Sequence, residues 1–251
     1  MTTYRYDGSF EGFLCAVAVA LEKETADDAV FISADDAGEQ PGLFGGGFCE
    51  IPAHRETARE IRDRFVRRAG SEAFAAARYA FYSRVPGSEQ LVCSYVQAGI
   101  RQGRAFLDRL ATEPVLSVNR LARKVSHEAH KFKGFVRFRE VEGGWLYAAV
   151  EPEHDILLLI VRHFADRTGD RPWLIHDLKR SQAVAHDAGR LQLIRDIRCE
   201  ESPVASAGEE EYAALWRSCF RSHAIRERSN APLQQKHVPL RYRRQLTEFD
   251  Q

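Results

Sequence analysis

The hydrophobic pattern of this chain changes period near residue 134, and that change restricts the possible folds more than any other feature. Before it, apolar residues recur at helical spacing and fall within about 60° of one direction on a helix; they are Val118, Leu121, Ala122, Val125, Ala129 and Phe132. After it, short alternating segments predict β-strands. We therefore expect a helix over 114–131 that leads directly into a sheet.

The segments on either side of this change predict an α+β fold, with a mostly helical N-terminal half and an antiparallel sheet with flanking helices in the C-terminal half. In the first half, Ser9 suits the N-cap of a helix over 10–23. Helical spacing also covers 55–103, with breaks at Gly70 and Pro86-Gly87, and short strands are expected at 4–7 and 30–33.

The second half alternates strands with single helices. Strands over 134–141 and 145–150 are expected to form a hairpin at Gly143-Gly144. Further strands are expected at 173–177, 183–186 and 191–194, helices at 156–166 and 209–226, and an irregular tail from Asn230. The pattern places a boundary near residue 113, between a mainly helical region 1–113 and an α+β region 114–251. One integrated domain over 1–251 is the alternative.

The composition is typical of a globular, water-soluble chain, with 44% hydrophobic and 29% charged residues. Its longest apolar run, near 156–161, is too short to span a membrane, and the N-terminus lacks a secretory pattern. The five cysteines are scattered and form no CxxC pair, which argues against a zinc ribbon or an iron–sulfur cluster. We therefore expect a cytoplasmic protein with no membrane contact and no cofactor.

The net charge of the chain is zero, but the charges are unevenly distributed. Residues 1–60 hold four basic and twelve acidic side chains, a net charge of −8, whereas 217–244 hold eight basic and one acidic, a net charge of +7. Within 120–140, seven lysines and arginines stand against two glutamates, a net charge of +5. Such separation suits nucleic-acid contact on one side, or an acidic surface that meets a basic partner; the alternative is that the two ends pack against each other and partly cancel.

The polar face of the predicted helix over 114–131 forms a cationic strip, consisting of Arg120, Arg123, Lys124, His127 and Lys131. His127 lies nearly opposite the apolar stripe, and cations on a rigid helix suit phosphate contact. With the basic segment that follows and the basic C-terminus, the candidate nucleic-acid-binding residues are Arg120, Arg123, Lys124, His127, Lys131, Lys133, Arg137, Arg180, Arg241, Arg243 and Arg244. The alternatives are a solvated helix face and a C-terminal tail clamped over its own domain.

Four residues are candidates for catalysis, namely His127, Glu128, His130 and Asp177. A histidine within the cationic strip could act as an acid or base near neutral pH, with a carboxylate to orient it. Asp177 ends a predicted strand, where it either faces a cleft or closes a turn through its side chain. His127 and His130 are three residues apart rather than four, so no HExxH motif is present, and we expect no metal site.

Several segments, in order along essentially the whole chain, carry a family resemblance; they are YDGSFEGFLCAV (6–17), HEAHKFKGFVRF (127–138), 152–164, WLIHDLKR (173–180) and VPLRYRRQLTEF (238–249). They resemble the bacterial "probable DNA metabolism protein" family. The resemblance implies a role in DNA repair or modification beside a putative radical-SAM protein. Related domains occur fused to a uracil-DNA glycosylase-like domain. The resemblance assigns no catalytic residue, and the chain lacks both the three-cysteine radical-SAM motif and a fused glycosylase domain.

Three functions follow from these patterns. The favoured one is a DNA-binding accessory protein that acts with a radical-SAM or uracil-DNA glycosylase-like partner, on single- or double-stranded DNA. The second is a DNA-processing enzyme that uses His127 with a nearby carboxylate. The third is an interaction module without nucleic-acid binding, in which the acidic N-terminal region covers the basic faces.

Overall fold

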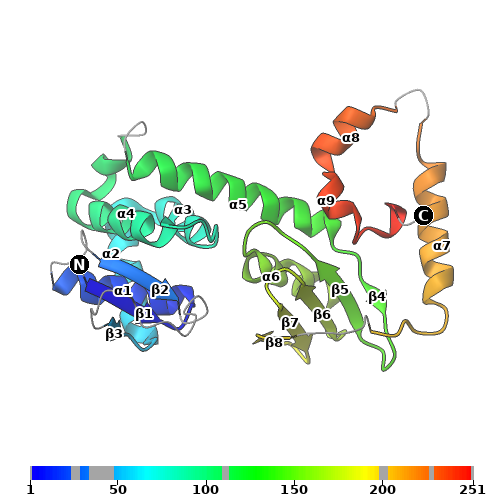
Figure 1. Ribbon diagram of the computed structural model, residues 1–251, viewed down its shortest axis with the longest axis horizontal. Helices are drawn as coiled ribbons and strands as arrows, with labels where there is room; N and C mark the ends of the chain where they lie inside the picture. Colours follow the sequence, from blue (N-terminus) through cyan, green and yellow to red (C-terminus); the bar gives the residue numbers. More distant parts are fainter. Residues whose placement is uncertain are drawn as a thin grey trace. The chain divides into compact units, whose positions relative to one another are not determined.

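The structure, a computed structural model, describes residues 2–23, 29–33, 48–108, 113–197, 203–225 and 229–249 (Figure 1). The chain divides into two compact units, Met1–Ser126 and His127–Gln251. The division falls inside one continuous helix, α5 (Val115–Phe135). The predicted α+β class is confirmed, since helices dominate the N-terminal half and a five-stranded, mostly antiparallel sheet lies in the C-terminal half.

The first unit combines a small parallel sheet with a layer of helices. Strand order is β2-β1-β3, and β1 pairs in parallel with both neighbours. The elements are β1 (Thr2–Tyr6), α1 (Phe10–Glu22), β2 (Ala29–Ser33), β3 (Phe48–Glu50), α2 (Arg55–Ala69), α3 (Ser71–Phe81), α4 (Ser88–Gln102) and a 3-10 helix at Gly103–Asp108. The pairing of β1 with two parallel neighbours was not predicted from the sequence.

Local signals explain where the helices of this unit begin and end. The Ser9 side chain accepts a hydrogen bond from the backbone N–H of Gly12, at 2.9 Å, and so caps α1 as predicted. Gly70 and Gly87 adopt φ of 100° and 81°, a backbone region that favours glycine, and they separate α2, α3 and α4. The predicted breaks are therefore confirmed.

The second unit is built on a sheet in the order β4-β5-β6-β7-β8. Its elements are β4 (Arg139–Glu140), β5 (Leu146–Val150), α6 (Leu157–Thr168), β6 (Trp173–Asp177), β7 (Gln182–Asp187), β8 (Arg190–Ile194), α7 (Glu209–Ser222), α8 (Ala231–His237), α9 (Leu240–Arg243) and a 3-10 helix at Thr247–Phe249. The predicted hairpin at Gly143-Gly144 is confirmed, because β4 and β5 pair antiparallel.

One pair of strands departs from the predicted antiparallel pattern. β5 and β6 run parallel, and α6 connects them across the sheet. The α6 side of the sheet is apolar, with Trp173, Ile175, Ile160 and Phe164 all buried. Because parallel strands end at the same edge, the segments that follow Val150 and Asp177 meet there.

Two predictions in this unit are wrong. The segment 134–141 was expected as a strand, but α5 continues to Phe135 and β4 holds two residues. Helix α5 extends because Phe132 and Phe135 pack against the ring of Tyr242, at ring-centroid distances of 5.0 and 5.9 Å. The tail from Asn230 was expected to be irregular, but it forms α8 and α9; the Asn230 side chain caps α8 by accepting from the N–H of Leu233, at 3.0 Å. The helix predicted over 209–226 ends at Ser222, and residue 226 lies outside the described ranges.

Candidate nucleic-acid interface

The cationic strip lies on α5 as the helical pattern predicted. Val118, Val125 and Phe132 of the apolar stripe are at most 3% exposed. On the opposite face Arg120, Arg123, Lys124 and His127 are exposed, and Lys131 is half-buried. Among the described residues, the side chains of Arg120, Arg123 and Lys124 form no ion pair and no hydrogen bond. Because the strip lies on one helix, the helix itself fixes the spacing of its charges.

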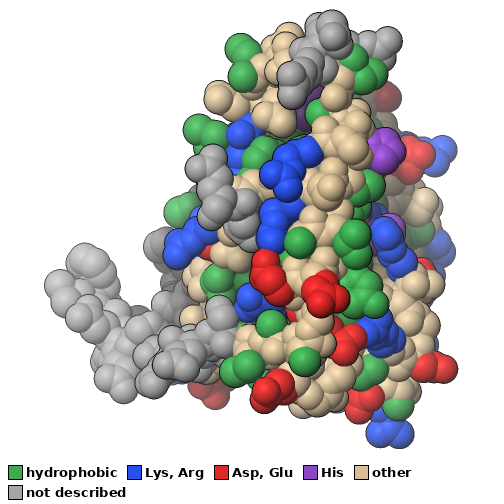
Figure 2. Space-filling view, turned by 90° about the vertical axis from the view of Figure 1, so that its right-hand side faces the viewer, with side chains coloured by type: hydrophobic (Ala, Val, Ile, Leu, Met, Phe, Trp, Pro, Cys, Tyr) green, Lys and Arg blue, Asp and Glu red, His purple; other side chains and the backbone are tan. Residues whose placement is uncertain are grey.

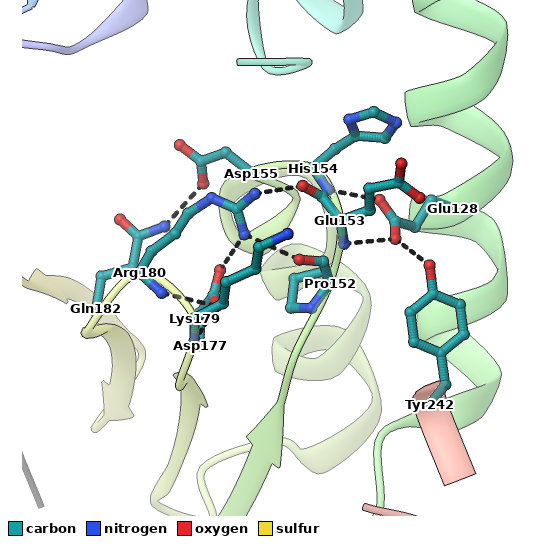
Figure 3. A network of polar contacts seen from close by, with 10 residues as sticks. All are labelled: Glu128, Pro152, Glu153, His154, Asp155, Asp177, Lys179, Arg180, Gln182 and Tyr242. Atoms are coloured by element: carbon teal, nitrogen blue, oxygen red, sulfur yellow. Dashed lines mark hydrogen bonds and ion pairs between the residues drawn. The ribbon is translucent and has the colours of Figure 1, made fainter. Parts of the chain in front are cut away.

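Glu128 lies on the same helix but belongs to the interior of the second unit. Its carboxylate accepts hydrogen bonds from the backbone N–H groups of Glu153 and His154, at 2.7 and 2.8 Å, and from the phenol of Tyr242 (Figure 3). Burial raises the pKa of Tyr242, and the hydrogen bond to Glu128 raises it further, so the phenol stays protonated and donates. Glu128 therefore joins α5, the segment after β5 and α9.

Asp177 and Arg180 form a second part of this network, at the edge where β5 and β6 end. Asp177 is fully buried; it accepts from the N–H groups of Lys179 and Arg180, at 3.0 and 3.2 Å, and pairs with the Arg180 guanidinium at 2.9 Å. Arg180 also donates to the carbonyls of Pro152 and Glu153, at 3.1 and 2.5 Å (Figure 3). Burial raises the pKa of Asp177, although Arg180 opposes the change. The sequence left two alternatives for Asp177, a side chain that faces a cleft and a turn closed by the side chain. The structure contains the turn.

The catalytic candidates are thus not assembled into one site. The carboxylates of Glu128 and Asp177 are already engaged with backbone N–H groups, Tyr242 and Arg180. His127 and His130 are exposed, and neither hydrogen bonds to a carboxylate within the described part of the chain. No group of three or more His, Cys, Asp or Glu among the described residues could hold a metal ion.

The C-terminal arginines have separate partners. Arg241 pairs with Glu153 at 3.0 Å, and Arg243 donates to the Val238 carbonyl at 3.2 Å and lies 4.5 Å over the ring of Phe249. Arg244 is exposed and forms no ion pair with a described residue. Arg241 and Arg243 therefore hold the C-terminal segment in place, whereas Arg244 remains accessible.

Arg137 has two roles in the second unit. It pairs with Glu248 through two hydrogen bonds, at 2.7 and 3.1 Å, and lies 5.4 Å over the ring of Trp216. Burial of Glu248 favours a higher pKa, but the hydrogen bonds from Arg137 and Trp216 outweigh it and lower the pKa of this carboxyl. Arg137 also lines both of the large cavities of this unit.

These two cavities lie along α7 and bring cations and aromatic rings together. The first, of about 750 Å³, has charged lining residues Lys133, Arg137, Glu140, Arg167, Arg171 and Glu209 and aromatic ones Phe138, Phe164, Tyr212 and Trp216. The second, of about 770 Å³, is lined among others by Arg137, Arg139, Tyr147, Glu209, Glu210, Arg217 and Arg244. Figure 2, which faces the side where α7 lies, shows blue cationic, red acidic and green hydrophobic side chains intermingled.

The structure thus gathers some of the predicted binding residues and separates others. Lys133, Arg137 and Arg244 line the two cavities, while Arg180, Arg241 and Arg243 have structural contacts. Sequence reasoning missed the cavity residues of α7 and α6, among them Tyr212, Trp216 and Arg167. The signal available for α7 was an aromatic at 212, 216 and 220, a spacing of four that places all three on one helix face.

Comparison with known proteins gives a family. A family model described as a domain of unknown function, DUF4130, matches residues 86–248. No curated protein and no solved structure matches the chain. Among the described residues, no helix combines the length and the apolar character needed to cross a membrane.

Proposed function

The chain belongs to the DUF4130 family, and we propose from the placement of its cations that it is a DNA-binding accessory protein. The observation that carries this proposal is the cationic strip of α5. Arg120, Arg123 and Lys124 are exposed and unpaired among the described residues, and they lie on a helix whose opposite face is buried. Cations held on a rigid element are what contact with a phosphate backbone requires.

The length of the strip fits a nucleic-acid backbone. Arg120 and Lys131 are eleven residues apart, which is about 16 Å along an α-helix at 1.5 Å per residue. That distance equals the axial rise of roughly five base pairs. The strip can therefore meet several successive phosphates, and His127 at its centre can donate a further hydrogen bond.

An accessory role is favoured over catalysis because the candidate carboxylates already have partners in the fold. A catalytic base must lie within hydrogen-bond reach of the group whose proton it takes, whereas Glu128 binds backbone N–H groups and Asp177 pairs with Arg180. The chemistry then belongs to a partner. The family resemblance implies a radical-SAM or uracil-DNA glycosylase-like protein in that role, and the net charge of −8 over the sequence 1–60 suits a basic partner.

The test is a fluorescence-anisotropy titration of labelled single- and double-stranded DNA with the full chain, at low and at physiological salt. We expect binding that weakens steeply with salt, because phosphate contacts release counterions. The variant Arg120→Ala/Arg123→Ala/Lys124→Ala should lose affinity for every sequence. The control Arg55→Ala/Arg59→Ala/Arg67→Ala removes the same charge from exposed positions of α2 and should bind as the wild type does.

Absence of binding to either DNA at low salt would overturn the proposal, and so would equal losses in the two triple variants. The accessory role is tested separately by adding the purified radical-SAM partner. Co-elution on size-exclusion chromatography supports the partnership, and independent elution at micromolar concentrations counts against it.

A further inference from the structure

Helix α7 is amphipathic, yet none of its side chains is buried. Tyr212, Leu215 and Trp216 are 73%, 65% and 44% exposed, and Phe220 is 38% exposed. A surface helix normally turns such an apolar stripe toward the core. Here the stripe lacks that cover within the described part of the chain, which leaves large apolar side chains open to a ligand.

Contacts at a few points attach α7 to β4 and to the C-terminal segment. At its start, Glu209 accepts a hydrogen bond from the N–H of Glu140, at 2.8 Å. Further along, the indole N–H of Trp216 donates to Glu248 at 3.0 Å, and the ring of Phe220 lies 5.9 Å from that of Phe249. The space beside these contacts is occupied by the two cavities.

The two cavities lie on opposite faces of the sheet edge. Leu146 lines the first and Tyr147 the second, and successive residues of a strand point to opposite faces. We call the first cavity, which is lined by Tyr212 and Trp216, the α7 groove; its volume of about 750 Å³ lies within the range of about 300–1,000 Å³ that is usual for ligand sites. The α7 groove is therefore large enough for more than one small planar group.

Cations outnumber carboxylates in the lining of the α7 groove. Lys133, Arg137, Arg167 and Arg171 stand against Glu140 and Glu209. Arg171 pairs with Glu140, and Arg137 pairs with Glu248. Lys133 and Arg167 form no ion pair with a described residue, so they are available to an anionic ligand.

Aromatic rings stand among these cations. Tyr212 and Trp216 lie on the α7 side, and Phe138 lines the same cavity. Interleaved aromatic rings and arginines suit single-stranded nucleic acid, since bases stack on the rings while phosphates meet the cations. In a duplex the base faces are stacked on one another and are not open to a ring of the protein.

We propose that the α7 groove binds single-stranded DNA, with unpaired bases stacked on Tyr212 and Trp216 and phosphates held by Lys133 and Arg167. This inference rests on the proposed DNA-binding function and adds to it the strand state of the ligand. The cationic strip would then contact backbone generally, while the α7 groove selects unpaired nucleotides.

The probe is an oligothymidylate, titrated into the full chain and compared with a duplex of the same length. Trp216 is the reporter in a Trp145→Phe background, because the remaining Trp173 is fully buried and a base stacked on Trp216 quenches its fluorescence. The test variant is Tyr212→Ala, since Tyr212 is 73% exposed and its loss leaves the contacts of Trp216 in place. We expect a loss of single-strand affinity of roughly 5-fold to 100-fold, the cost of one lost base stack, with duplex affinity unchanged.

A second comparison tests the charges, with Arg167→Ala against Arg221→Ala, which removes an exposed cation of α7 that does not line the groove. Only Arg167→Ala should weaken oligothymidylate binding and reduce its salt dependence. If Tyr212→Ala and Arg167→Ala bind the oligothymidylate as the wild type does, while the triple variant of the cationic strip loses DNA, the groove proposal is overturned and the proposed function stands. If the wild type binds neither DNA, both are overturned.

Discussion

Replacing Glu128 by alanine should destabilise the second unit strongly, because one buried carboxylate holds three parts of it together. Glu128 is 6% exposed and accepts from the N–H groups of Glu153 and His154 and from the Tyr242 phenol. Hydrogen bonds to a charged group each contribute about 1.5–3 kcal/mol, and those of one acceptor are not additive. Its removal leaves two backbone N–H groups and a phenol without their acceptor, each at a cost of about 1–3 kcal/mol when buried, so we expect a total loss of about 3 kcal/mol or more.

The assay is urea unfolding of the full chain followed by tryptophan fluorescence. All three tryptophans lie in the second unit, at 145, 173 and 216, so the signal reports on that unit. Tyr242→Phe removes one of the three hydrogen bonds and should cost about 1.5–3 kcal/mol. His127→Ala changes the exposed neighbour and should stay within about 0.5 kcal/mol of the wild type. The reasoning is refuted if Glu128→Ala unfolds at the same urea concentration as His127→Ala.

Three further predictions concern stability, and the first two are followed by tryptophan fluorescence. Arg180→Ala should cost about 3–5 kcal/mol, because it leaves a buried carboxylate without its partner, whereas exposed Lys179→Ala should change stability by less than about 0.5 kcal/mol. The folded pKa of Glu248 lies below its ordinary value of 4.5, so the stability from its pair with Arg137 is present above pH 4.5 and is lost as the pH falls through the folded pKa. Trp216 emission should therefore shift in acid in the wild type, and the variant Glu248→Gln should lack this transition. Alanine at the first three cations of the cationic strip, which belong to the first unit, should leave the urea midpoint followed by circular dichroism within the error of the wild type; a clear fall would favour an interaction module over DNA binding.

Local signals in the sequence were sufficient for most helices and strands. The N-cap at Ser9, the helix breaks at Gly70 and Gly87 and the hairpin at Gly143-Gly144 each depend on neighbouring residues, and each was predicted. The two helices of the C-terminal tail also had a local signal, since Asn230 is a good N-cap and Pro232 suits the first turn. That signal was outweighed by the proline and arginine content of the tail.

The features that were not predicted depend on contacts between distant residues. Helix α5 continues through Gly134 because Tyr242 packs on Phe132 and Phe135. The parallel pairing of β5 with β6 leaves no trace in the period of either strand, which is two in both kinds of sheet.

The candidate site shows the same limit. A count of charges identifies Lys133, Arg137 and Arg180 as cations, but it does not reveal their partners. Arg137 pairs with Glu248, 111 residues away, and Arg180 binds two carbonyls of the segment after β5. The helical period placed the exposed cations of α5 correctly because a helix face is a local property. The α7 groove could not be predicted from the sequence, because its lining comes from segments far apart along the chain.

The salt dependence of DNA affinity tests the central claim most directly. For a protein that neutralises phosphates, the logarithm of the binding constant falls linearly with the logarithm of the salt concentration, and the slope drops by about one for each cation removed from a phosphate contact. The wild type should show a steep slope, and alanine at Arg120, Arg123 and Lys124 should reduce it by about three. A slope that is the same in the two proteins, or binding that does not respond to salt, would contradict DNA binding by the cationic strip.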